Sequence, residues 1–133
     1  MQIPVDRPTP QDRETLAQLL VAVGTQLLRE VSEPTVVAAF RLAIAEAVHA
    51  PEVAQALDSI GRETARSALR KLMAEAIAAG LLEGRPAELT EQFGALLWGD
   101  LMMSLLLGLA PQPNAREIAR RARDATAAFL RQT

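Results

Sequence analysis

Prolines and glycines divide the chain into five segments in which apolar residues recur every three or four positions. This spacing places the apolar side chains on one face of an α-helix. The breaks fall at residues 32–34, 50–51, 80–86 and 111–113. The pattern predicts helices over residues 10–31, 34–49, 51–80, 86–109 and 115–131, with residues 1–9 as an extended N-terminal segment.

Composition agrees with a fold made of helices alone. Ala occurs 25 times and Leu 20 times in 133 residues, and both are strong helix formers. Residues that favour strands are scarce, with three Phe, one Trp and no Tyr. We therefore expect an all-α, five-helix bundle in which residues 10–133 form one domain.

Several residues indicate where helices begin, end or bend. Thr9 followed by Pro10 predicts the start of the first helix, and Gly80 predicts the end of the third. Asn114 with Glu117 three positions later is a variant of the capping box. Gly61 interrupts the large residues of the third helix and indicates a bend there or a close contact with another helix.

The chain has little of the chemistry that enzymes use. It contains no Cys, a single His and no phosphate-binding or catalytic motif, so we expect no catalysis, metal or cofactor. That His49 lies near the predicted end of the second helix, where an imidazolium would suit the helix dipole. The net charge of −2 argues against DNA binding by this chain.

Only residues 93–109 have enough apolar character to suggest a membrane span. They form a stretch of about 17 residues with Asp100 near its middle, whereas a spanning helix needs about 20. The N-terminus also lacks the basic and apolar pattern of a signal peptide. We therefore expect a cytoplasmic protein without membrane contact.

Asp100 is the acidic residue in the most apolar predicted helix, where an unpaired charge is costly. Arg41 is a candidate partner because a guanidinium can hold a carboxylate through two hydrogen bonds. The sequence leaves two roles open for Asp100, which are a structural ion pair and a polar contact in a ligand pocket.

The fourth predicted helix contains three glycines, Gly94, Gly99 and Gly108, each costing about 1 kcal/mol relative to Ala. Close approach of another helix would explain them. An apolar stripe on this helix and one on the last helix predict a two-fold, four-helix dimer interface. Its expected residues are Trp98, Leu101, Leu105, Gly108, Ile118, Ala122, Ala125 and Phe129.

The first four helices would then enclose a second apolar space. Facing helices of a bundle build ligand pockets from apolar residues with a few polar groups. The candidate ligand-binding residues are Leu20, Val23, Phe40, Ile44, Ile77, Phe93, Leu97 and Asp100. The same residue types also form filled cores, so the sequence leaves both interpretations open.

Particular segments of the chain resemble a known family. Residues 40–47, the Pro51-Glu52-Val53-Ala54 sequence and residues 91–101 are similar to the C-terminal domain of TetR-family transcriptional regulators, in particular the AefR-like subgroup. The resemblance covers residues 14–131 and implies a dimer formed by the last two helices. It also implies a small hydrophobic effector among the other helices.

Regulators of this family bind DNA through an N-terminal helix-turn-helix head, for which residues 1–9 leave no room. The resemblance therefore implies a ligand-sensing and dimerisation domain of a repressor, with DNA contact only through a head that this chain lacks. The chain would then be part of a longer regulator or a headless relative. A helical module that pairs with a protein partner and binds no small molecule is the alternative.

Overall fold

The computed structural model describes residues 9–133, and every regular element in that part of the chain is helical. The elements are α1 (Arg13–Val31), α2 (Pro34–Ala45), α3 (Pro51–Leu57), the π-helical turn η1 (Asp58–Arg62), α4 (Glu63–Ala78), α5 (Pro86–Trp98), α6 (Leu101–Leu106) and α7 (Ala115–Gln132). The predicted all-α class is confirmed. The N-terminal segment predicted as extended lies, apart from Thr9, outside the described residues.

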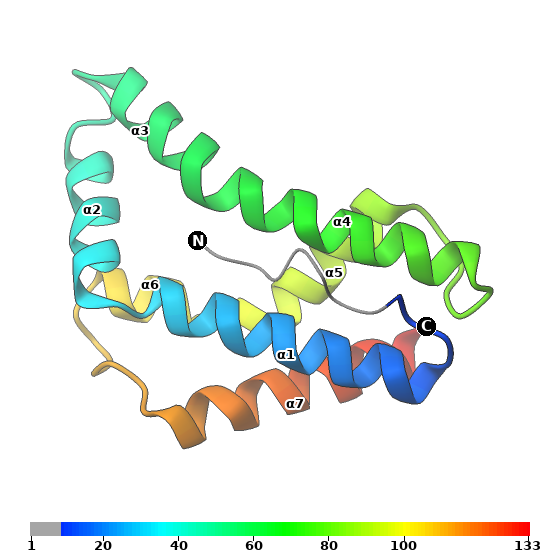
Figure 1. Cartoon of the computed structure of the whole chain (residues 1–133). Coiled ribbons are helices and arrows are strands. Elements are labelled where there is room, and N and C mark those ends of the chain that lie inside the picture. The colour runs from blue at the N-terminus through cyan, green and yellow to red at the C-terminus, as the bar shows by residue number, and fades with distance from the viewer. Residues whose placement is uncertain (1–8) are drawn as a thin grey trace.

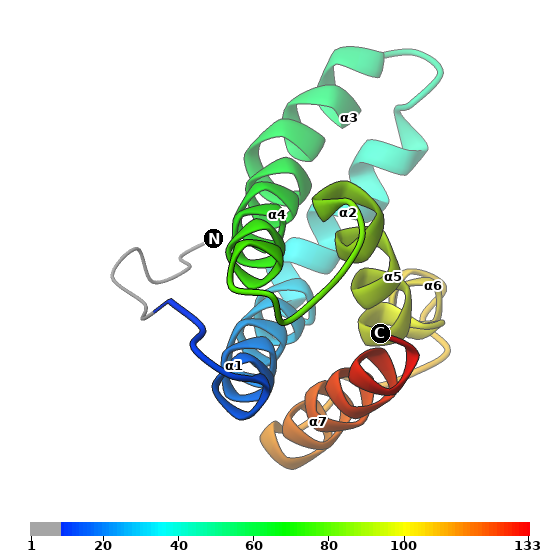
Figure 2. The same ribbon diagram turned by 90° about the vertical axis from the view of Figure 1, so that its right-hand side faces the viewer.

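The helices form a wedge that is closed at one end and open at the other. The rod made of α3, η1 and α4 diverges from α1, and α2 spans the distance between them where they are farthest apart (Figure 1). Helix α7 packs along α1. Turned by 90°, the molecule shows α5, α6 and α7 together on one side (Figure 2).

The filled core lies at the closed end of the wedge, where α1, α4, α5 and α7 meet. Phe93 of α5 and Phe129 of α7 are fully buried and meet edge to face, with ring centroids 5.5 Å apart. A Cβ at Gly24 of α1 would lie 3.1 Å from Leu97 Cδ1. The missing side chain at Gly24 therefore allows α1 and α5 to pack closely.

Local signals for helix ends are mostly confirmed. Helices α2, α3 and α5 begin at Pro34, Pro51 and Pro86 as expected. Gly80 follows α4 with a φ of +76°, a conformation that glycine adopts without strain. The Asn114 side chain accepts a hydrogen bond from the Glu117 amide at 2.8 Å, which caps α7.

Other predicted boundaries are wrong. Helix α1 begins at Arg13, not at residue 10, because Asp12 and not Thr9 caps it by accepting from the Thr15 amide at 2.7 Å. Helix α2 ends at Ala45 instead of residue 49. His49 is therefore exposed in a turn and not in the last turn of a helix.

The helix predicted over residues 86–109 breaks at Gly99, which separates α5 from α6. Gly99 has φ +49° and ψ −129°, a backbone region that residues with a Cβ rarely enter. Gly108 has φ +70° directly after α6. Backbone conformation thus explains these two glycines, and at Gly99 a Cβ would in addition lie 3.3 Å from Arg121 Nη1 of α7. In the part of the chain that the structure describes, no helix is long and apolar enough to span a bilayer.

Candidate ligand-binding site

A cavity of about 650 Å³ lies in the open end of the wedge, between α2, the α3–η1–α4 rod, α5 and α6. Helical spacing explains how α2 and α5 contribute to its wall: positions 40, 43 and 44 share one face of α2, and positions 91, 94, 95 and 98 share one face of α5. The apolar lining residues are Val31, Phe40, Ala43, Ile44, Ala47, Ala54, Leu57, Ala65, Leu69, Ala95, Trp98, Met102 and Leu106.

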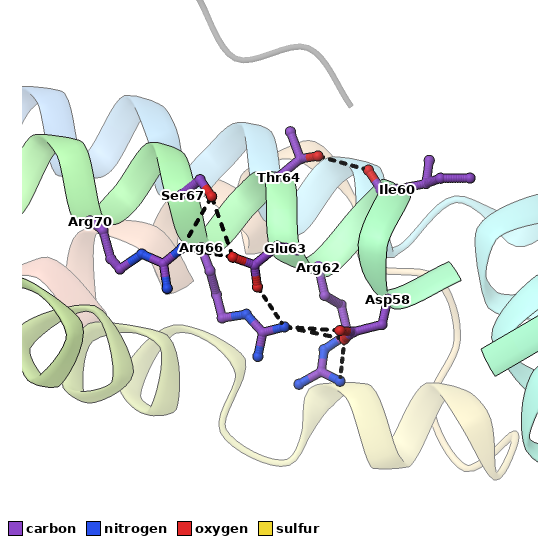
Figure 3. Close-up of polar contacts among 8 residues, drawn as sticks. All are labelled: Asp58, Ile60, Arg62, Glu63, Thr64, Arg66, Ser67 and Arg70. Atoms are coloured by element: carbon purple, nitrogen blue, oxygen red, sulfur yellow. Dashed lines mark hydrogen bonds and ion pairs between the residues drawn. The ribbon is translucent and has the colours of Figure 1, made fainter. Parts of the chain in front are cut away.

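The polar part of the wall is a cluster of charges on the rod. Asp58 Oδ1 accepts from Arg62 Nη1 at 3.0 Å, and Asp58 Oδ2 accepts from Arg66 Nη2 at 3.1 Å. Figure 3 shows both guanidinium groups converging on this carboxylate. Because Asp58, Arg62 and Arg66 all line the cavity, its largely apolar wall carries an ionic region on the rod, and Thr90 and Glu91 of α5 are its other polar residues.

A second carboxylate extends the cluster along α4. Glu63 Oε1 accepts from Arg70 Nη2 at 2.7 Å, and Glu63 Oε2 lies 3.1 Å from Arg66 Nη2. The hydrogen bond from Arg70, together with the positive charges of Arg70 and Arg66, lowers the pKa of the Glu63 carboxyl below its ordinary value of 4.5. Glu63 is therefore ionised at neutral pH and holds the two arginines in place.

The π-helical turn η1 adjoins this cluster. The Glu63 amide donates to the Asp58 carbonyl five residues earlier, which inserts one extra residue into the helix. A Cβ at Gly61 would meet nothing within 4 Å, so the predicted close helix contact at this residue is wrong. Gly61 instead belongs to the widened turn that separates α3 from α4.

The structure places seven of the eight predicted ligand-binding residues in the cavity or in the core. Phe40 and Ile44 line the cavity. Four others are buried in the filled core with their side chains packed against α1, α5 and α7, namely Leu20, Val23, Phe93 and Leu97. Ile77 packs on the edge of the core.

Asp100 was expected in the ligand pocket or in an ion pair with Arg41, and neither placement is found. The interruption of the helix at Gly99 leaves Asp100 exposed at the start of α6. The Asp100 carboxylate therefore needs no buried partner. Arg41 instead donates from Nη2 to the Leu105 carbonyl at 2.7 Å and from Nε to the Leu106 carbonyl at 3.0 Å. It thereby ties α2 to the end of α6.

Most of the predicted interface residues face the interior of the single chain. Six of them are at most 7% exposed and belong to the core cluster, namely Leu101, Leu105, Ile118, Ala122, Ala125 and Phe129. Trp98 lines the cavity, and Gly108 lies near Arg41. Side chains buried this way leave little surface for a second copy.

A groove of about 480 Å³ lies on the other side of α5, against α7 and residues 110–113. Leu101, Ile118 and Ala125 line it from within the core, while Leu96 of α5 and Ala128 of α7 are its half-buried apolar residues. Arg121 of α7 also lines it and donates to the Trp98 carbonyl at 3.3 Å. This hydrogen bond connects α7 to the end of α5, beside the cavity.

Sequence reasoning missed the polar cavity residues Asp58, Arg62 and Arg66. A signal was present, because positions 58, 62, 66 and 69 follow the helical period and so continue the stripe of the buried Leu69. Charged residues on the same stripe as core residues indicate a polar group that faces inward.

The chain was compared with known proteins and families. No curated protein and no solved structure matches it significantly. The family model described as the AefR-like transcriptional repressor, C-terminal domain, matches residues 18–132. This match covers all the helices that form the cavity and the groove, and the chain therefore belongs to the AefR-like C-terminal domains of the TetR family of transcriptional regulators.

Proposed function

We propose that this domain binds a small hydrophobic effector in the cavity between α2, the α3–η1–α4 rod, α5 and α6, and forms a homodimer through α5, α6 and α7. The observation that carries the proposal is an apolar cavity of about 650 Å³ beside a separate, filled core. Small-molecule sites commonly have volumes of about 300–1,000 Å³. The role is regulatory and not catalytic, as in the family to which the chain belongs.

The division between core and cavity supports ligand binding. Leu20, Leu72 and Phe93 are fully buried, so the closed end of the wedge needs no ligand for its packing. At the open end, Ile44 is 61% exposed although it is apolar, and Phe40 is only partly buried. An apolar ligand would remove such surfaces from water, which is favourable by about 25 cal/mol per Å².

The groove between α5 and α7 supports the dimer part of the proposal. Leu96 and Ala128 provide apolar surface, and Arg121 and Asp124 provide opposite charges that a two-fold partner could match. Two helical segments from each copy would form a four-helix interface. The contact surface is thus expected on this groove instead of on the buried stripe of α7.

Direct links join the cavity to that interface. Arg41 connects α2 to α6, and Arg121 connects α7 to the carbonyl of Trp98, which itself lines the cavity. A ligand that moves α2 or the end of α5 would therefore act on α6 and α7. Such a ligand changes the dimer only if it binds two dimer geometries with different affinities.

In a full regulator this response would alter the spacing of two helix-turn-helix heads and so control repression in the cytoplasm. DNA contact would come from those heads. No role in DNA binding is proposed for residues 9–133.

A matched pair of variants tests the ligand site. Ala54→Phe adds an aromatic ring to the cavity wall, whereas Ala74→Phe adds the same ring to the exposed face of α4. Thermal shifts and the fluorescence of Trp98, the single tryptophan of the chain, report binding from a library of apolar compounds. Compounds that stabilise the wild type and Ala74→Phe but not Ala54→Phe support the proposal. No shift with any compound, in a stable dimer, would favour a protein-interaction module without a ligand.

A further inference from the structure

We infer that the effector carries a carboxylate at one end of an apolar body, and that Arg62 and Arg66 bind this group inside the cavity. The inference rests on the proposed ligand site and specifies the chemical class of its ligand. It follows from the placement of Arg62 and Arg66, the two guanidinium groups that line this cavity in residues 9–133.

The charges of the cluster do not balance. Arg62, Arg66 and Arg70 face the two carboxylates Asp58 and Glu63, so three positive charges meet two negative ones and leave a net charge of +1. Arg62 and Arg66 share the single carboxylate of Asp58, while Glu63 is bound by Arg70 as well as Arg66. The other carboxylate at this cavity, Glu91 on α5, is exposed and belongs to none of these ion pairs, so a ligand carboxylate on the rod would neutralise the cluster.

The Arg66 guanidinium also has a hydrogen-bond donor for which the surrounding residues provide no acceptor. Arg66 contacts both carboxylates through the same nitrogen, Nη2, which donates to Asp58 and lies 3.1 Å from Glu63 Oε2. The Nε of Arg66 is buried and has no hydrogen-bond partner. Nε and an adjacent Nη form the pair of parallel donors that a carboxylate accepts. The Nη on the same side as the Nε proton is Nη2, so a ligand carboxylate that accepts from this pair would share Nη2 with Asp58 or displace Asp58 from it.

The rest of the wall favours an apolar body for the same ligand. Phe40, Leu57 and Trp98 line the cavity on three different elements. The Thr90 hydroxyl on the facing wall donates to the Pro86 carbonyl at 2.8 Å. Its proton is therefore not available for a hydrogen bond to a ligand. Glu91 of α5 is exposed at the edge of the cavity and disfavours an acidic group there, so the ligand's acidic end is expected beside Arg62 and Arg66. The cavity therefore suits an acid with one charged end.

Three probes with the same alkyl chain length and different head groups distinguish the contribution of the ligand's charge from that of its apolar chain. Decanoate, decanol and decylamine are titrated into the whole chain, with calorimetry and Trp98 fluorescence as readouts. Arg66→Met removes one cavity guanidinium, and Arg62→Met does so at a more exposed position in case the first variant folds poorly. Lys71→Met removes the same charge from an exposed position on α4 and is the matched control.

We expect decanoate to bind about tenfold or more tightly than decanol, because hydrogen bonds between ions are stronger than neutral ones. Arg66→Met or Arg62→Met should reduce this preference at least severalfold with little change for decanol, and Lys71→Met should preserve it. Equal affinity for decanoate and decanol, or a preference for decylamine, would overturn the inference while leaving the apolar site intact. Failure of all three probes to bind the folded dimer would overturn the proposed ligand site itself.

Discussion

Truncation of two phenylalanines should separate the filled core from the cavity wall. Phe93 is fully buried and packs edge to face on Phe129, with centroids 5.5 Å apart. Replacing a core Phe with Ala costs about 3–5 kcal/mol in unfolding free energy. Phe40 lines the cavity and is only partly buried, so Phe40→Ala should cost about 1–1.5 kcal/mol, or half of full burial.

These free energies convert to melting temperatures through the entropy of unfolding. For 133 residues this entropy is about 0.28 kcal/mol/K, so each kcal/mol lowers the Tm by roughly 3–4 °C. Phe93→Ala should lower the Tm by about 10–18 °C, and Phe40→Ala by about 4–5 °C. Urea unfolding at a fixed protein concentration gives the free energies independently, since a dimer's Tm depends on concentration.

Ligand affinity should respond in the opposite order. Phe40→Ala should weaken decanol binding severalfold, because its ring lines the cavity. Phe93→Leu, which is milder than Phe93→Ala and loses mainly the aromatic pair of about 0.5–1.5 kcal/mol, should leave affinity nearly unchanged. Equal stability losses at Phe93 and Phe40, or a loss of affinity only at position 93, would refute the division into core and cavity.

Three further predictions follow from particular residues. Gly99→Ala should destabilise the domain by about 1–3 kcal/mol in urea unfolding because of its positive φ, whereas Gly61→Ala should not destabilise it, since its Cβ meets open space. The lowered pKa of Glu63 contributes stability above its ordinary value of 4.5 that is lost as the pH falls through the folded pKa. Urea unfolding of Glu63→Gln should therefore depend less on pH below about 5, and an unchanged slope would contradict this. Ala128→Arg should dissociate the dimer in light scattering while Ala74→Arg should not; dimers of both variants would exclude the groove as the interface.

The helix positions could be predicted because their signals are local. Pro34, Pro51 and Pro86 start helices through their fixed φ and missing amide proton, and these effects need no tertiary contact. The end of α5 was missed for a different reason. The apolar stretch extends past Gly99 into α6 with Asp100 as its charged residue, and α5 ends at the positive φ of Gly99, which the residue pattern does not reveal.

The site was only partly predictable because cores and cavities use the same side chains. Phe40 and Phe93 both follow a helical apolar period, yet one lines the cavity and the other fills the core. The distinction depends on how far α1 and the α3–η1–α4 rod diverge, which is a property of the whole fold. The placement of Arg62 and Arg66 on the cavity wall depends on the same divergence.

The position of a bound apolar ligand tests the proposed site most directly. A crystal of the domain grown with a bromine-labelled alkanol locates the ligand through the anomalous signal of bromine. We expect one bromine position in each chain, inside the cavity between Phe40, Leu57 and Trp98. A bromine bound only in the groove between α5 and α7, or among Leu20, Val23 and Leu97 of the core, would contradict the proposal.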